Sequence, residues 1–340
     1  MKKLLFLFTI PLLAMISCTN GDEPAPVPVD DTTLYMAVNG LTGFPEAIYD
    51  LDGNTIYQSE EGDRIKSLVA EGSDWYAVIL KEDGATHVVK NGETIFMTGE
   101  TIWCFAVEDG IVYTVQESKL LNEIWVYKNF RRLYEVPSNV YYNTFSVDHG
   151  NVAMGVYDEK PCYWYNGEII PIEGLENGFD WVYGIDKKGD NMLITYQDIT
   201  TRKYMYWWKD SHEEMPVGFR PSMSQIVNGH AFILGQKITS QSVGGVRGCP
   251  AVMIDGVVTI LSNDDRDCEA VGLASHDMDT YILVNNPSAV YSTVYKNMQP
   301  INLPDVKTPY SVGPYGSGVN QDGKSNLSTL GINAIVVVKR

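Results

Sequence analysis

Residues 88–96 read VVKNGETIF, and this stretch decides the fold because variants of it recur along the chain. Each copy has two or three aromatic or β-branched residues, then Asn or Asp, usually Gly, and then a second apolar run. Asn, Asp and Gly tolerate the positive φ that a two-residue β-hairpin turn requires. Each copy therefore predicts a hairpin. The seven copies begin at Tyr49, Val88, Val126, Tyr163, Trp207, Val252 and Val294.

The fourth position of every copy is Asn or Asp, and four copies continue with Gly. The other three continue with Phe130, Ser211 and Met298, which do not suit positive φ. We expect longer turns or other turn types at those three places. The residues at the fourth position are Asp52, Asn91, Asn129, Asn166, Asp210, Asp255 and Asn297.

The spacing of the copies predicts the architecture. Successive fifth positions are separated by 39, 38, 37, 44, 45 and 42 residues, close to the repeat of roughly 40 to 50 residues of a four-stranded propeller blade. A strand-then-glycine signal precedes most copies, as in FAVEDG ending at Gly110 and FSVDHG ending at Gly150. Each unit therefore predicts two successive hairpins, which is four antiparallel strands.

The two ends of the repeat region predict a closed ring. Only residues 39–45 separate TLYMAV from EAIYDL, so the first unit has no space for another strand, whereas the apolar strand at residues 334–338 has no hairpin partner after it. Pairing of the first and last strands would complete one blade and leave no open sheet edge. This closure resembles that of WD-repeat and kelch propellers in architecture, although neither family's sequence motif is repeated here.

The predicted fold is therefore all-β: a single seven-bladed β-propeller of four-stranded antiparallel blades. A ring of six or eight blades is the main alternative. A β-sandwich, or two smaller β domains with coincidental Asn-Gly turns, would require seven unrelated turns to align.

The N-terminus predicts export. Lys2 and Lys3 precede an apolar run from Leu4 to Ile16 that is too short to span a bilayer as a helix. The following junction at Cys18 resembles the lipobox of bacterial lipoproteins, with Met15 in place of the usual Leu. The resemblance implies cleavage after residue 17 and a lipid on Cys18. An ordinary secretory signal or an uncleaved anchor is the alternative.

Residues 18–32 form an acidic, proline-rich stretch that is too poor in apolar residues to fold, and it predicts an extended tether. Asp22 and Glu23 resemble the surface-export signal of Bacteroidetes lipoproteins, which implies an outer-membrane lipoprotein facing outside. A periplasm-facing position is the alternative. The predicted organisation is a signal peptide at 1–17, the tether at 18–32 and the propeller at 33–340.

The composition restricts the partners. The net charge is −18, and it becomes −20 once Lys2 and Lys3 leave with the signal peptide. Such a chain repels phosphate backbones, which argues against nucleic acid as a partner. The 21 Tyr, 10 Phe and 7 Trp residues suit strands and also supply surfaces on which sugars stack.

Propellers generally bind ligands where the loops leading into the innermost strands, and those linking second and third strands, gather around the central channel. The predicted loops carry aromatic residues and an arginine, which suit carbohydrate or apolar side chains. For any one of these residues, packing of blade against blade is the competing interpretation. The candidate ligand rim contains Trp103, Tyr141, Tyr142, Trp181, Phe219, Arg220 and Tyr310, with Phe179 beside them.

Three further features follow from local sequence. Residues 235–248 form the longest predicted loop between second and third strands and carry Lys237 and Arg247, so we expect either a flexible segment or a recognition loop.

Cys249 and Cys268 are a candidate disulfide in an exported protein. Carboxylates near residue 265 are weak Ca²⁺ candidates, but they lack EF-hand spacing, which favours a solvated acidic loop. These carboxylates are Asp264, Asp265 and Asp267.

No cofactor or other metal site is predicted, and no catalytic motif identifies catalytic residues. The sequence has neither HExxH nor a GxSxG nucleophile elbow. The leading hypothesis is a non-enzymatic binding or scaffold protein that presents the rim to a glycan or a partner protein. The alternatives are a surface glycan-processing enzyme, a glycosidase or lyase, and a structural subunit of an envelope complex.

Overall fold

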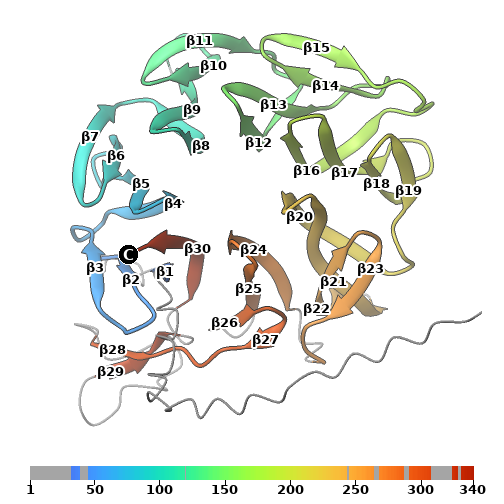
Figure 1. Ribbon diagram of the computed structural model, residues 1–340. Coiled ribbons are helices and arrows are strands. Elements are labelled where there is room, and N and C mark those ends of the chain that lie inside the picture. Colours follow the sequence, from blue (N-terminus) through green and yellow to red (C-terminus); the bar gives the residue numbers. More distant parts are fainter. Residues whose placement is uncertain are drawn as a thin grey trace, which may run out of the picture. The chain divides into compact units, whose positions relative to one another are not determined.

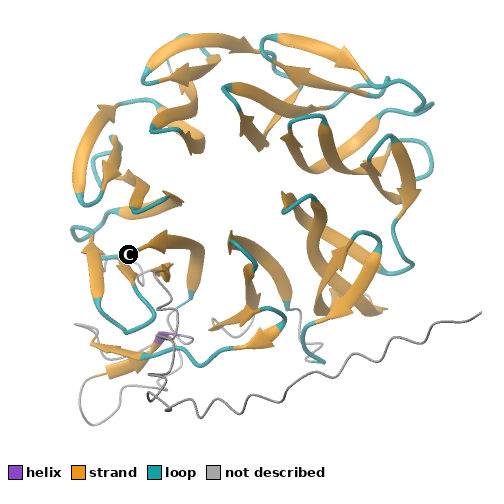
Figure 2. Ribbon diagram, viewed as in Figure 1, coloured by secondary structure: helices purple, strands orange, loops and turns teal. Residues whose placement is uncertain are grey.

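The computed structural model describes residues 32–38, 45–118, 120–242, 245–263, 268–286, 291–307, 324–327 and 331–340. Cys18 and residues 18–31 of the predicted tether lie outside these ranges, whereas Thr32, its last residue, already belongs to the first strand. Within Thr32–Arg340, seven four-stranded antiparallel sheets are arranged as the blades of a ring (Figure 1). The prediction of an all-β, seven-bladed propeller is confirmed, and Figure 2 shows how strands dominate the described elements. No helix in the described ranges is long and apolar enough to cross a membrane.

Blades 2 to 7 each use four strands that are consecutive in sequence, from the innermost to the outermost. Blade 2 contains β4 (Arg64–Glu71), β5 (Asp74–Leu80), β6 (Thr86–Lys90) and β7 (Glu93–Thr98). Blade 3 contains β8 (Thr101–Glu108), β9 (Ile111–Ser118), β10 (Glu123–Lys128) and β11 (Arg131–Val136). Blade 4 contains β12 (Val140–Asp148), β13 (Asn151–Val156), β14 (Cys162–Tyr165) and β15 (Glu168–Pro171).

The remaining consecutive blades follow the same order around the ring (Figure 1). Blade 5 contains β16 (Phe179–Lys188), β17 (Asn191–Asp198), β18 (Tyr204–Trp208) and β19 (Ser211–Glu214). Blade 6 contains β20 (Phe219–Val227), β21 (His230–Ser242), β22 (Gly245–Ile254) and β23 (Val257–Ile260). Blade 7 contains β24 (Glu269–His276), β25 (Asp279–Asn286), β26 (Tyr291–Lys296) and β27 (Gln299–Pro300).

Blade 1 closes the ring by joining the two ends of the propeller. The C-terminal strand β30 (Ile332–Lys339) is innermost and pairs with β1 (Thr32–Val38), which is followed outward by β2 (Ala47–Tyr49) and β3 (Thr55–Gln58). The antiparallel β1–β30 register runs from Thr32 opposite Lys339 to Val38 opposite Ile332. The predicted closure is confirmed, and it hides the edges that both terminal strands would otherwise expose.

A two-stranded sheet between blades 7 and 1 was not predicted. It pairs β28 (Asp305–Lys307) with β29 (Lys324–Asn326). Leu303, Val306 and Leu327 pack with the core that blades 1 and 7 share. This sheet therefore covers the closed seam from outside.

The turns between third and fourth strands correct part of the sequence interpretation. Asn129 and Phe130 have φ of 44° and 63°, and Asn297 and Met298 have φ of 49° and 65°. Both pairs form two-residue turns, so the expectation of longer or different turns was wrong there. At Phe130, the ring stacks on Phe96 with centroids 4.0 Å apart, a contact that offsets part of the cost of left-handed backbone.

The Asn or Asp of these turns has a second role beyond its φ. The Trp75 N–H donates to the side-chain oxygen of Asn91 at 2.9 Å, while the Asn91 N–H donates to the Trp75 carbonyl at 3.0 Å. The side chain thus extends the pairing between the third and second strands of its blade. The same two bonds join Asn129 to Val112, Asn166 to Val152, Asp255 to Ala231 and Asn297 to Thr280.

Blade 5 departs from this rule. Its β18–β19 turn is Lys209–Asp210, with φ of 50° and 60°, and Ser211 already belongs to β19. The prediction of an unusual turn at Ser211 was therefore wrong: the turn is of the two-residue kind but lies one residue earlier. Lys209 occupies the place of the Asn or Asp, and Asp210 occupies the place of the Gly.

Residues 235–242 and 245–248 belong to strands, contrary to the expectation of a flexible loop. The described parts of β21 and β22 continue as a hairpin beyond the blade, with Ile238 opposite Gly248 and Ser242 opposite Gly245. Because β20 pairs with β21 only as far as Lys237, the outer end of this hairpin is a two-stranded ribbon.

Candidate functional site

The strands of each blade alternate in direction, which separates the connections onto two faces. We call the face that carries the loops before the innermost strands, and the loops between second and third strands, the loop face. The opposite face, with the short turns after first and third strands, is the turn face. The predicted ligand rim belongs to the loop face.

Near the loop face, each innermost strand has a β-bulge at the equivalent place. The register between first and second strands skips one residue in five blades, skips Asp180 and Tyr183 separately in blade 5, and skips several residues between Tyr141 and Ser146 in blade 4. Bulges redirect side chains out of the regular alternation of a strand. Apart from Asp180, the residues skipped singly are Lys66, Trp103, Tyr183, Ser222, Val271 and Asn333.

Four aromatic side chains from blades 4 and 5 form a continuous tract, which we call the aromatic tract: Tyr141, Trp181, Tyr183 and Tyr204. The ring centroids are 5.1 Å apart for Tyr141 and Trp181, 6.5 Å for Trp181 and Tyr183, and 5.7 Å for Tyr183 and Tyr204. Trp181 remains 46% exposed. The tract therefore presents an open indole whose orientation is fixed by its neighbours.

Polar groups border the aromatic tract. The Tyr141 hydroxyl donates to the Asp180 carbonyl at 3.0 Å, and the Asp180 carboxylate pairs with the Arg202 guanidinium. Burial, together with the neighbouring Tyr204, raises the pKa of Tyr183, whereas the positive charge of Arg220 opposes that rise. Arg220 itself is exposed. An aromatic surface thus lies beside a carboxylate, hydroxyls and guanidinium groups that can hydrogen-bond a polar ligand.

A second exposed indole lies on blade 3. Trp103 is 47% exposed, and its Nε1–H donates to the Glu117 carboxylate at 2.9 Å. The hydrogen bond comes from the neighbouring strand of the same blade and restricts the rotation of the ring. Trp103 and Trp181 are therefore both half-exposed indoles held by neighbours, Trp103 by Glu117 and Trp181 by the Tyr141 and Tyr183 rings.

The loop face also carries much of the exposed apolar surface. Among the described residues, six of the twelve exposed large apolar side chains lie there, and Met278 alone lies in a turn of the opposite face. Where exposed apolar side chains form a patch, they mark a binding face. The six are Trp103, Leu120, Leu121, Tyr157, Trp181 and Val217.

Two members of the predicted rim belong to the core instead. Phe219 is 1% exposed and packs with the core of blades 5 and 6, and Phe179 is also 1% exposed, with its ring 4.4 Å from Tyr196. For these two, the competing interpretation of packing between blades holds, because the first residue of the strand points into the sheet interface. Sequence reasoning could not separate them from Trp181, which lies two residues after Phe179.

Several predicted residues stay untested. The side chain of Tyr142, and all of Tyr310, Asp264, Asp265 and Asp267, lie outside what the structure describes. Cys249 lies on β22 of blade 6 and Cys268 directly precedes β24 of blade 7; they are 6% and 5% exposed, and their pairing stays a prediction. No group of three potential metal ligands occurs within the described ranges.

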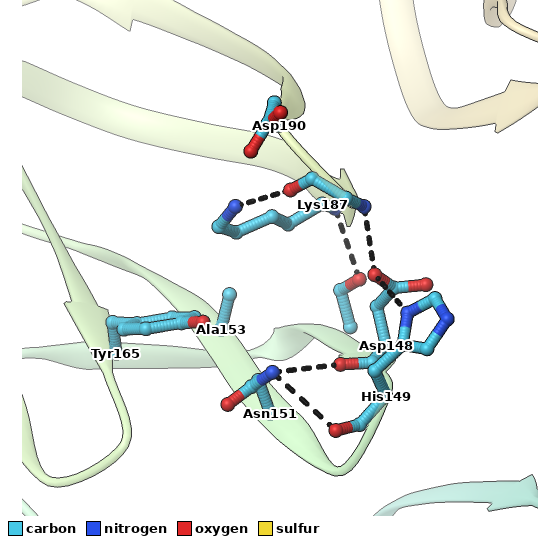
Figure 3. A pocket seen from close by; sticks show the side chains of 9 residues that line it. Asp148, His149, Asn151, Ala153, Tyr165, Lys187 and Asp190 are labelled. Carbon is cyan, nitrogen blue, oxygen red and sulfur yellow. Dashed lines mark hydrogen bonds and ion pairs between the residues drawn. The ribbon is translucent and has the colours of Figure 1, made fainter.

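A polar cavity of about 280 Å³ lies at the turn face between blades 4 and 5 (Figure 3). Lys187 crosses it, with its ammonium 2.6 Å from the Gly189 carbonyl and 5.7 Å from the centre of the Tyr165 ring. The Asp148 carboxylate accepts the Gly189 N–H at 2.7 Å and contacts His149 Nδ1 at 2.9 Å. Because Asp148 and Lys187 already hold neighbouring backbone groups, this cavity is chiefly a polar joint between two blades.

Comparisons with known proteins support the fold. The chain matches no family model and no curated protein. Among solved structures, the β-propeller domain of the Trilobed protease from Pyrococcus furiosus has a TM-score of 0.55 at 12% identity, covering 82% of this chain and 96% of that one. That propeller is described as having an open velcro topology, whereas β1 and β30 close the ring here.

Two structures from bacteria are more distant. BamB from Moraxella catarrhalis has a TM-score of 0.37 at 13% identity, covering 65% of this chain and 66% of that one. The extracellular domain of a hybrid two-component system from B. thetaiotaomicron has a TM-score of 0.48 at 13% identity, covering 82% of this chain and 39% of that one. Likeness at such low identity concerns the fold alone.

Proposed function

We propose that this protein is a lipid-anchored glycan-binding module of the bacterial outer membrane, and that its ligand binds to the loop face of blades 3 to 5. The observation that carries the proposal is the pair of half-exposed indoles on the same face: Trp103, hydrogen-bonded to Glu117, and Trp181, which follows Asp180 of the Asp180–Arg202 ion pair in the chain. The lipid on Cys18 and the outward orientation rest on the N-terminal sequence.

The chemistry of this face suits a sugar. An aromatic ring stacks on the C–H groups of a pyranose, while adjacent carboxylate and guanidinium groups bond its hydroxyls. Asp180 and Arg202 supply such groups beside Trp181, and Glu117 supplies one beside Trp103. The indoles are restrained by their neighbours before any ligand arrives, which lowers the entropic cost of binding.

A partner protein is the second candidate ligand. Leu120 and Leu121 are 91% and 53% exposed in the β9–β10 loop, and adjacent exposed leucines favour contact with another protein. This candidate would make the protein a scaffold or a subunit of an envelope complex.

Affinity electrophoresis in polysaccharide-containing gels tests the proposal with protein that lacks residues 1–31. We expect retardation in at least one gel, and we expect Trp181→Ala and Trp103→Ala to weaken it roughly 5- to 30-fold, equivalent to about 1–2 kcal/mol of binding free energy. Met278→Ala is the control, because Met278 is 84% exposed on the turn face.

The outcomes separate the hypotheses. Release of oligosaccharides from a retarding polysaccharide would replace the binding module with a glycan-processing enzyme. No retardation by any polysaccharide, combined with a co-purifying protein that is lost on Leu120→Asp, would replace the glycan with a protein partner. Retardation that neither tryptophan variant alters would remove the site.

A further inference from the structure

A second cavity, of about 360 Å³, lies between the outer strands of blades 4 and 5. It shares no lining residue with the aromatic tract. Its floor is apolar, because Ile172 and Met192 are 5% and 8% exposed and belong to the core that these blades share.

The walls of this cavity are aromatic. Trp207 and Tyr163 line it, and both are partly buried against the same core. The alternation of β18 explains the orientation of Trp207: Met205 and Trp207 pack toward blade 4, whereas Tyr206 and Trp208 pack toward blade 6.

Two carboxylates lie at the mouth. Glu173 and Asp210 line the cavity and are exposed, and neither makes a hydrogen bond or ion pair with any residue that the structure describes. Two other exposed acids on the blades do have cationic neighbours: the Glu214 carboxylate is 2.6 Å from the Lys203 ammonium, and that of Asp74 is 2.7 Å from the Lys90 ammonium. The described residues that line the cavity thus include two carboxylates and no cationic side chain.

Asp210 is at the mouth because blade 5 departs from the repeat. In five other blades, the Asn or Asp of the equivalent turn uses its side chain to bond the second strand, as Asn166 does with Val152. The turn in blade 5 begins one residue early, so Lys209 takes that position and the Asp210 carboxylate has no such bond within the described chain. The Lys209 ammonium lies 4.8 Å from the centre of the Trp208 ring, which packs toward blade 6 rather than toward the cavity.

We propose that this cavity is a binding site for an organic cation, namely a primary amine or a guanidinium on an aliphatic stem, as in a lysine or arginine side chain. The stem packs on Met192 and Ile172, the aromatic walls attract the positive charge, and Glu173 and Asp210 pair with it. The net charge of −18 adds a long-range attraction for such a ligand. A neutral apolar ligand would leave both carboxylates without a partner.

Titration with small probes, followed by ligand-observed NMR, tests this site in protein that lacks residues 1–31. Nα-acetyl-lysine methylamide is the cationic probe, and Nα-acetyl-norleucine methylamide is its neutral analogue with a similar stem. We expect saturable binding of the lysine probe with a Kd on the order of 1 mM, at least fivefold tighter than that of the norleucine probe and weakened by added salt.

The variants assign the binding to this cavity. Asp210→Asn and Glu173→Gln each weaken the lysine probe about threefold and the double variant about tenfold, as expected for exposed ion pairs. Asp109→Asn is the matched control, because Asp109 is an exposed turn aspartate with φ of 51° in blade 3, and it leaves binding unchanged. Equal affinity for both probes, or unchanged binding in the double variant, overturns the proposal.

A last comparison distinguishes the source of the cation. Cadaverine represents a free amine, and an acetyl-Gly-Lys-Gly amide represents a lysine within a polypeptide. Tighter binding of the peptide supports a protein partner, and tighter binding of cadaverine supports a small-molecule ligand. Failure of both to bind rejects the site, whatever the polysaccharide gels show, since Trp103 and Trp181 lie on a different surface.

Discussion

Replacement of Asp186 tests how the blades hold one another. Asp186 lies on β16 of blade 5 and is 6% exposed. Its two carboxylate oxygens accept hydrogen bonds from the Ser146 hydroxyl of blade 4 and from the Ile226 N–H of blade 6, both at 2.7 Å. A single side chain thus joins three consecutive blades.

The magnitude follows from those two bonds. A hydrogen bond to a charged group contributes about 1.5–3 kcal/mol, but the burial of the carboxylate cancels part of this. Asp186→Ala leaves the Ser146 hydroxyl and the Ile226 N–H without their acceptor, so we expect a loss of about 3 kcal/mol and a fall in Tm of about 6 °C. Asp186→Asn keeps an oxygen for Ile226 and an amide for Ser146, and it should cost about 1 kcal/mol.

The pH dependence supplies a second readout. Burial is the largest influence and raises the pKa of Asp186, although Lys188 and the two hydrogen bonds oppose it. A carboxyl whose folded pKa exceeds its unfolded value of about 3.9 binds protons more readily in the folded state. Its contribution is therefore fully present below the unfolded pKa and declines as pH rises through the folded pKa. Wild type should gain stability relative to Asp186→Asn as the pH falls from 7.5 to 4.5.

Urea unfolding followed by tryptophan fluorescence measures both effects. Asp190→Ala is the control, since Asp190 is exposed near the same joint and should change stability by no more than about 0.5 kcal/mol. The reasoning is refuted if Asp186→Ala unfolds at the same urea concentration as the control, or if the difference between wild type and Asp186→Asn does not vary with pH.

Three further predictions concern other parts of the chain. Phe130→Ala should be less stable than Phe130→Gly by about 1 kcal/mol, because both lose the stack on Phe96 but only alanine keeps a Cβ at positive φ; equal urea midpoints would contradict this. Mass spectrometry of protein exported by a bacterial host should find a lipid on Cys18, and an unmodified N-terminus at another residue would remove the anchor. Non-reducing peptide maps of the same sample should join Cys249 to Cys268, and separate thiol peptides would reject the bridge.

The sequence predicted the ring because its signals are local and repeated. A two-residue turn imposes its own backbone requirement on Asn91 and Gly92, and repetition of that requirement at a spacing near 40 residues fixes the number of blades. The sequence also predicted closure of the ring by β1 and β30, because the repeat region begins with an incomplete unit and ends with a strand that has no hairpin partner.

The arrangement of side chains on the loop face was harder to predict from the sequence, for a physical reason. The β-bulges follow from pairing between first and second strands, so no local signal marks Tyr183 as part of the aromatic tract. The burial of a side chain also depends on residues distant in sequence, since Phe219 packs in the core that blades 5 and 6 share. The sequence did not predict that the blade 5 turn begins at Lys209, because Asp210 matches the fourth position of the repeat.

The two proposed sites share one structural logic. A propeller repeats its turns and strand pairings, so most side chains make the same structural contact in every blade. A side chain that does not make this contact can instead bind a ligand. Asn166 is occupied by Val152, whereas a one-residue shift frees Asp210 to face a cavity. Trp103 and Tyr183 leave the regular strand alternation at equivalent bulges, yet Ser222 and Asn333, at the same position, donate hydrogen bonds to the next blade. Equivalent positions thus serve structure in blades 1 and 6 and present aromatic groups in blades 3 and 5, which is why we place the ligand on the latter side of the ring.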